Sequence, residues 1–197
     1  MMRFRQLLAH DERGATIIEF AIIAPTFLLL LIGTFDLGHQ VYLRAVLNGA
    51  IQQASRASAL ETGPSNIAAI DAEVSSQVKR IVPDGVVAFT RKSYFSYNDV
   101  KRAETLADAN GNGTCDNNEA YEDENNNLKW DLDIGAAGAG NARDVVVYNV
   151  SVSYDQLFPL WALLGTSQRK TVSAETILKN QPYGKQGTKT IVSRTCS

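Results

Sequence analysis

An uncharged apolar run near the N-terminus constrains the fold of this chain more than any other feature. Residues 20–35 read FAIIAPTFLLLLIGTF, and extending the run back to Ala15 adds one charged residue, Glu19. A helix that crosses a bilayer needs about 20 apolar residues. A cleaved secretory signal peptide is the alternative, but no small-residue cleavage site follows the run. We therefore predict a retained transmembrane helix over residues 15–35.

Basic residues before this run predict its orientation. Arg3, Arg5 and Arg13 all precede the predicted span. Because arginines next to a span remain on the cytoplasmic side, the N-terminus is expected in the cytoplasm. The sequence thus predicts a single-pass protein with its head across the membrane, which for a bacterial inner membrane means in the periplasm or outside the cell.

The residues around the start of the span carry a family resemblance. Residues 13–20 read RGATIIEF and are followed by AIIAPTFLLLLIGTFDLG. This pattern resembles the class III signal of type IV pilin-like proteins, and in particular that of the TadE-like pseudopilins of tight-adherence (Flp) pilus systems. The resemblance implies cleavage by a prepilin peptidase between Gly14 and Ala15, and a role for Glu19 and Phe20 in assembly. Its implied partners are the membrane and other pilin-like subunits, contacted through the N-terminal helix.

Glu19 has a physical role if that cleavage takes place. Ala15 would then carry a free ammonium group, and a carboxylate four residues later can neutralise it or the amine of a neighbouring subunit. Such a pair in a low dielectric would fix the axial register of packed helices. The alternative is a carboxylate near the helix end that extends to the lipid headgroups, where its energetic cost is small.

The remaining sequence predicts an α+β fold of pilin-like type. Apolar residues at helical spacing continue the first helix towards Leu60, although a break at Gly33 or Gly38 is an alternative. A second helix is expected over residues 65–80, and strands are expected over 86–90, 93–97, 144–154 and 170–179. The predicted divisions are a cytoplasmic leader (1–14), a transmembrane helix (15–35), an amphipathic stalk helix (36–63), a helix with the first strands of the head (64–104), an acidic calcium-loop insert (105–143) and a C-terminal hairpin and tail (144–197).

The connection inside the C-terminal hairpin is unusually apolar. Residues 156–165 read QLFPLWALLG. A segment of this kind either packs under the long helix or dips into the membrane surface, and ordinary core packing is an equal alternative.

The acidic insert predicts a cation site. Residues 105–133 carry eight acids against one base in a chain whose net charge is −2. Residues 108–119 fit the twelve-residue calcium loop, with oxygen donors at positions 1, 3, 5, 7, 9 and 12 and glycine at position 6. The predicted ligands are Asp108, Asn110, Asn112, the carbonyl of Thr114, Asp116 and Glu119.

A second, poorer copy of the calcium loop begins at Asp123. Leu128 replaces its glycine, and Ile134 stands where the bidentate acid belongs, so that Asp133 is the nearest acid able to substitute. Ca²⁺ is the expected cofactor, and a solvated acidic loop is the alternative for both copies. The predicted ligands of this copy are Asp123, Asn125, Asn127, the carbonyl of Lys129 and Asp131.

Two cysteines, Cys115 and Cys196, lack zinc or redox spacing. In an oxidising compartment they could form one disulfide that ties the C-terminus to the first calcium loop, and elsewhere they would be two thiols.

The composition excludes several functions. Both histidines lie in the first 40 residues, and no nucleophile–base pair or phosphate loop is present, so we expect no enzyme. The near-zero net charge argues against a nucleic-acid partner. The sequence therefore predicts a minor pseudopilin that takes part in pilus assembly or a related secretion apparatus. A membrane-tethered, calcium-dependent adhesin or binding module outside any filament is the alternative.

Overall fold

A computed structural model describes residues 13–63 and 65–196. Residues 1–12 of the predicted leader, including Arg3 and Arg5, lie outside the described residues. The fold divides into two units, one formed by residues 1–42 and 155–170 and the other by residues 43–154 and 171–197. Helices and antiparallel strands are both present, which confirms the predicted α+β class.

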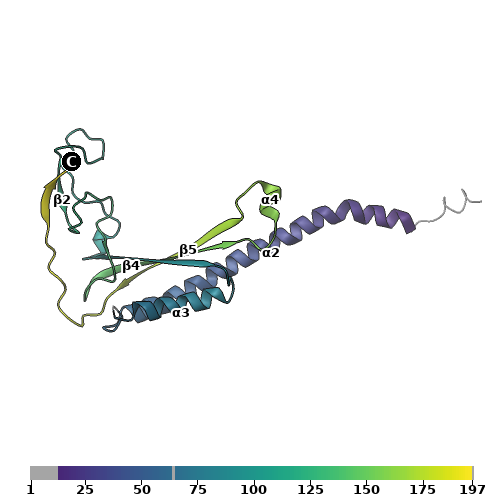
Figure 1. The fold of residues 1–197 in the computed structure, drawn as a ribbon, viewed down its shortest axis with the longest axis horizontal. Coiled ribbons are helices and arrows are strands. Elements are labelled where there is room, and N and C mark those ends of the chain that lie inside the picture. The colour runs from purple at the N-terminus through teal and green to yellow at the C-terminus, as the bar shows by residue number, and fades with distance from the viewer. Residues whose placement is uncertain (1–12, 64, 197) are drawn as a thin grey trace, which may run out of the picture. The chain divides into compact units, whose positions relative to one another are not determined.

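The first helix, α2, runs without a break from Arg13 to Ser58. Figure 1 shows it as one coiled ribbon, so a break at Gly33 or Gly38 is excluded. Pro25 lies inside the helix, where it lacks the N–H that would bond to the carbonyl four residues earlier. Among the described residues, α2 is the one helix that is long and apolar enough to cross a membrane.

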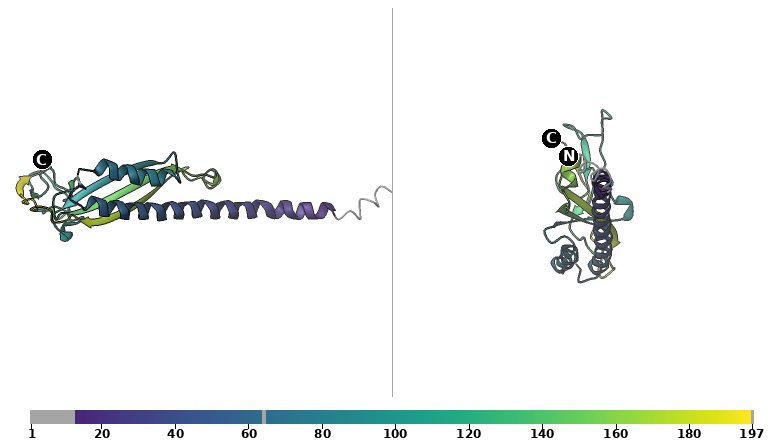
Figure 2. Two further views of the ribbon diagram at one scale, coloured as in Figure 1. Left: turned by 90° about the horizontal axis from the view of Figure 1, so that it is seen from below. Right: turned by 90° about the vertical axis from the view of Figure 1, so that its right-hand side faces the viewer.

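In the second unit, the C-terminal part of α2 packs beside α3, which spans Ile67–Lys79 (Figure 2). This helix begins later than predicted. Asn66 occupies the N-cap position, whereas Ser65 donates its hydroxyl to the carbonyl of Thr62.

A four-stranded sheet completes this unit, with strand order β3-β1-β4-β5. Its strands are β1 (Val86–Tyr94), β3 (Ala136–Ala137), β4 (Val145–Asp155) and β5 (Arg169–Lys179). The strands predicted over 86–90 and 93–97 form a single strand that ends at Tyr94, and a 3₁₀ turn follows at Tyr97–Asp99. The Gly/Ala-rich end of the predicted insert contributes β3, which pairs with β1.

A second, two-stranded sheet joins β2 (Ala120–Asp123) to β6 (Val192–Thr195). No strand was predicted in either segment. Both are short and carry several polar residues, and each forms through its pairing with the other, which is distant in sequence.

The core of the second unit lies between the helices and the four-stranded sheet. Fully buried side chains from α2, α3 and β4 meet there, among them Leu47, Val78 and Tyr148. The other face of β4 is covered as well, because Val145 and Val147 pack against Tyr94 and Ile134. Burial of both faces explains the unbroken apolar run Val145–Tyr148 at the start of β4, after which half-buried polar residues alternate with buried apolar ones.

Candidate functional site

The N-terminal part of α2 exposes apolar side chains along its length. Ile17 and Phe20 are each 70% exposed, and Leu30 is 68% exposed. Glu19 lies exposed beside Phe20, while Gly14 and Ala15 fall in the first turn of the helix. An apolar surface of this extent is unfavourable in water and favourable in lipid. This helix therefore fits a single-pass membrane protein.

The first acidic loop, residues 108–119 and hereafter loop 1, is built around Asp108. Its carboxylate accepts the backbone N–H groups of Gly111 at 2.7 Å, Asn112 at 3.2 Å and Gly113 at 2.7 Å. Both glycines have positive φ, near 70°, a conformation that glycine adopts without steric cost. Thr114 donates its N–H to the side chain of Asn112 at 2.8 Å.

The other predicted ligands of loop 1 converge on one another. The side-chain amides of Asn110 and Asn112 each donate to the same oxygen of Asp116 at 2.7 Å. The carboxylate of Glu119 accepts the backbone N–H groups of Ala109 and Asp116, both at 2.9 Å. These contacts bring together the side chains at positions 3, 5 and 9 of the loop, while the carboxylates at positions 1 and 12 accept backbone N–H groups of the same loop.

The second acidic loop, residues 123–134 and hereafter loop 2, repeats these contacts. Asp123 accepts the N–H groups of Asn127 and Leu128, both at 3.1 Å. The side-chain amides of Asn125 and Asn127 donate to one oxygen of Asp131, at 2.9 and 2.5 Å. The two loops therefore share one hydrogen-bonding pattern.

The backbone of loop 2 follows the path of loop 1 without its glycines. Asn126 and Leu128 have φ values of 59° and 72°, where loop 1 has Gly111 and Gly113. Lys129 donates its backbone N–H to the side-chain oxygen of Asn127 at 2.9 Å, as Thr114 does to that of Asn112 in loop 1. A leucine in the left-handed region costs about 1–2 kcal/mol, so loop 2 is strained at this residue.

Glu104 takes the place of the acid that the sequence of loop 2 lacks. Its Oε1 accepts the N–H of Glu124 at 2.8 Å, and its Oε2 accepts the N–H of Asp131 at 3.0 Å. These N–H groups belong to positions 2 and 9 of loop 2, the same positions that Glu119 contacts in loop 1. Glu104, which is only 3% exposed, was not among the predicted ligands.

Asp133 does not take this role. Its two oxygens accept hydrogen bonds from Lys92 and from the Tyr94 hydroxyl, each at 2.8 Å. The suggestion that Asp133 replaces the missing acid is therefore wrong, because its carboxylate contacts β1 and not the predicted ligands of loop 2.

An internal repeat of 15 residues is the sequence signal that would have revealed Glu104. Glu104 stands four residues before Asp108, and Glu119 stands four residues before Asp123. The segments preceding the loops pair through an antiparallel bridge between Leu106 and Tyr121, which are equivalent positions of the repeat. The two repeats are thus related by a local twofold axis. Glu104 precedes loop 1 but contacts loop 2, whereas Glu119 precedes loop 2 but contacts loop 1.

The electrostatic environments of the loops differ. Backbone N–H groups, first of all that of Gly113, lower the pKa of Asp108. Burial raises the pKa of Glu104, although the backbone hydrogen bonds that it accepts oppose this shift. Burial also acts to raise the pKa of Asp123, but the hydrogen bond from Arg194 Nε, 2.6 Å from Oδ2, outweighs it and lowers the pKa.

The donor set of each loop combines carboxylates with amides. Nowhere in residues 13–63 and 65–196 do three or more His, Cys, Asp or Glu side chains group as they would around a metal ion. Oxygen donors for a hard cation therefore have to include the amides and a backbone carbonyl. The amide oxygen of Asn110, which accepts one backbone N–H, retains a second lone pair for such a contact.

The C-terminal segment ties the two loops together. Cys115 of loop 1 forms a disulfide with Cys196, with 5.8 Å between the two Cα atoms and 81 residues of sequence separation. A closed chain of that length stabilises the fold by about 4–5 kcal/mol in the chain-entropy picture. Just before Cys196, β6 pairs with β2, and Arg194 of β6 forms an ion pair with Asp123 of loop 2.

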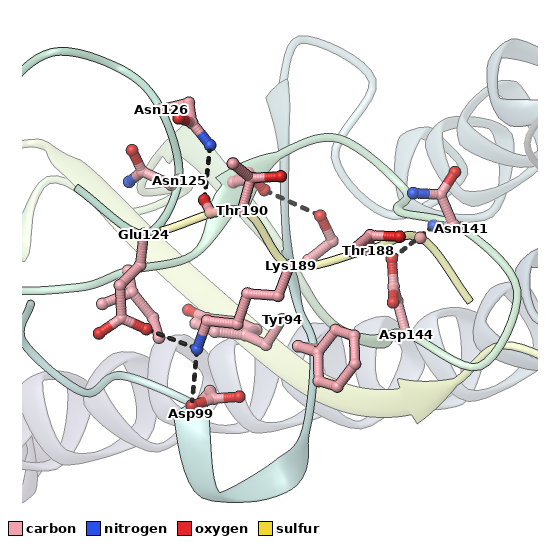
Figure 3. A pocket seen from close by; sticks show the side chains of 15 residues that line it. Tyr94, Asp99, Glu124, Asn125, Asn126, Asn141, Asp144, Thr188, Lys189 and Thr190 are labelled. Carbon is pink, nitrogen blue, oxygen red and sulfur yellow. Dashed lines mark hydrogen bonds and ion pairs between the residues drawn. The ribbon is translucent and has the colours of Figure 1, made fainter. Parts of the chain in front are cut away.

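A polar cavity of about 330 Å³ lies beside loop 2 (Figure 3). The ammonium of Lys189 extends into it, 2.5 Å from Glu124 Oε2 and 3.8 Å from Asp99 Oδ1. Burial acts to raise the pKa of Glu124, but hydrogen bonds from Arg102 and Lys189 outweigh this effect and lower it. The ion pair between Lys189 and Glu124 therefore ties the C-terminal segment to loop 2.

Comparison with known proteins bears on the N-terminal helix. Residues 14–56 match the family model described as TadE-like protein. The matched residues all lie within α2 and include Glu19, Phe20 and the apolar run. No curated protein and no solved structure matches the chain. This match supports a likeness to TadE-like proteins over residues 14–56. The TadE-like family in turn suggests a membrane protein related to tight-adherence pili.

Proposed function

We propose that this chain is a membrane-anchored minor pseudopilin that takes part in assembling a tight-adherence type IV-like pilus or a related secretion apparatus. The observation that carries the proposal is the TadE-like match over residues 14–56, which falls on an apolar helix with one exposed acid, Glu19. Its role is structural and not enzymatic. The anchor lies in the bacterial inner membrane, with the N-terminus in the cytoplasm and the head in the periplasm.

The proposal includes processing by a prepilin peptidase between Gly14 and Ala15. Cleavage there creates an ammonium group four residues before Glu19. Phe20 and the apolar side chains that follow it pack laterally against the helices of other pilin-like subunits, and Glu19 neutralises an amine at that contact. The exposure of Ile17, Phe20 and Leu30 supports this role, since an assembling helix must offer its side chains to neighbours.

The proposal also includes a calcium-stabilised head. Ca²⁺ takes six to eight hard oxygen ligands and accepts carboxylates, amides and carbonyls. In loop 1 the predicted set is Asp108, Asn110, Asn112, the Thr114 carbonyl, Asp116 and Glu119, and in loop 2 it is Asp123, Asn125, Asn127, the Lys129 carbonyl and Asp131, with Glu104 as the added acid. The convergence of these side chains in both loops supports the proposal.

The two loops are not expected to bind the cation equally. Arg194 forms an ion pair with Asp123, whose side chain is fully buried, while the described contacts of Asp108 are with backbone N–H groups. A guanidinium group on a ligand reduces the negative charge available to a cation. Leu128 adds backbone strain to loop 2. Loop 1 is therefore the tighter site.

Deleting the gene in the bacterium that encodes it tests the proposed function. We expect surface pili, counted by electron microscopy, to disappear and to return when the wild-type chain is expressed from a plasmid. Unchanged piliation in the deletion strain would favour the tethered adhesin or binding module, which needs no filament.

A further inference from the structure

The connection between β4 and β5 is an uncharged apolar segment in the same unit as the N-terminal part of α2. Residues 156–168 contain no charged residue, and the short helix α4 occupies Leu160–Leu164. Leu157 is 65% exposed and Leu164 is 71% exposed. Exposed apolar side chains gathered on one short connection indicate a surface that meets an apolar partner.

Two contacts place this connection along α2. Gln156 Nε2 donates a hydrogen bond to Asp36 Oδ2 at 2.5 Å. The Leu160 Cδ1 atom lies 3.9 Å from the point that a β-carbon on residue 33, a glycine, would occupy. Asp36 is the first charged residue after the apolar run, so it marks the level at which the helix leaves the hydrocarbon. Gly33 lies about one helical turn deeper.

We infer that residues 157–164 insert into the head-side interface of the lipid bilayer, beside α2, as a second contact with the membrane. The partner is lipid because the segment is continuous with the apolar surface of the transmembrane helix. Trp161 lies at its centre, and tryptophan is enriched at the membrane–water interface. Charged residues begin only at the base of the connection, where Arg169 Nε lies 3.7 Å from Asp155 Oδ1. This inference rests on α2 crossing the membrane.

Tryptophan fluorescence in proteoliposomes tests the inference with the full-length chain. The protein has two tryptophans, Trp161 in the connection and Trp130 in loop 2. In phosphatidylcholine vesicles, lipids brominated on their acyl chains should quench the tryptophan fluorescence of the wild-type protein. Bromines close to the headgroups should quench it most. The matched Trp161→Phe variant, which retains Trp130, should show no loss of fluorescence.

A second measurement keeps the test independent of that substitution. Photoreactive lipid analogues should label peptides from residues 156–168 of the wild-type chain, as mapped by mass spectrometry. The inference would be overturned if the wild-type and Trp161→Phe proteins were quenched equally and these peptides carried no label. Crosslinking of these residues to a second protein chain in place of lipid would also overturn it. Carbonate extraction of the same vesicles tests the anchor separately, because a chain retained in the pellet with unquenched Trp161 refutes only the second contact.

Discussion

Replacing Glu104 with glutamine is expected to remove calcium from loop 2 while loop 1 remains filled. The variant keeps the shape of the side chain but removes a charge that would lie next to a divalent cation. A pair of unit charges 4 Å apart is worth about 4 kcal/mol near a protein surface, so we expect affinity at this site to fall by at least about a hundredfold. Isothermal titration of the purified full-length chain should give two ions for the wild type and one for Glu104→Gln.

Three matched variants make this result specific. Glu119→Gln should remove the ion from loop 1 and spare loop 2. Glu122→Gln makes the same charge change on an exposed residue of β2 and should leave both sites filled. Asp133→Asn should also leave both filled, because Asp133 contacts Lys92 and Tyr94. Two ions bound by the Glu104→Gln variant with unchanged affinities would refute the assignment of Glu104.

Replacing Glu19 with alanine is expected to prevent assembly without preventing insertion into the membrane. The apolar run from Phe20 to Phe35 is unchanged in this variant, so the chain should still be recovered in the membrane fraction. Loss of the carboxylate leaves an amine unpaired in a low dielectric, at a cost of several kcal/mol per subunit. We expect at least about tenfold fewer pili when the variant replaces the wild type in the deletion strain.

Thr16→Ala is the control for the Glu19 variant, since Thr16 is also exposed near the start of α2 but is uncharged. It should assemble as the wild type does. Glu19→Gln separates charge from shape and should fail as Glu19→Ala does. Normal pilus numbers with Glu19→Ala would show that Glu19 merely extends to the headgroups.

Local patterns in the sequence predicted the parts of this fold that form locally. The apolar run and the helical spacing after it predicted α2, and the alternating residues of Val145–Asp155 predicted β4. The short strands β2 and β6 escaped prediction because each exists only through pairing with the other. Strand β3, two residues long, is held in the same way by β1.

The candidate calcium site shows a similar division. The spacing of Asp108, Asn110, Asn112 and Asp116 matches the pattern of a calcium loop, and the structure brings the last three of these side chains together. Glu104 was missed because a linear motif places the final acid at the end of its own loop. In the folded chain the two repeats pair, so that the acid of loop 2 is Glu104, which precedes loop 1 in the sequence. A search for self-similarity at 15 residues would have aligned Glu104 with Glu119.

The mature N-terminus tests the central claim most directly. Intact-mass measurement of the chain purified from the membrane fraction should give a product that lacks residues 1–14 and begins at Ala15. The same measurement in cells without active prepilin peptidase should give the full-length chain. An intact chain beginning at Met1 in peptidase-positive cells, or a soluble product cut beyond Phe35, would contradict the assignment as a pseudopilin.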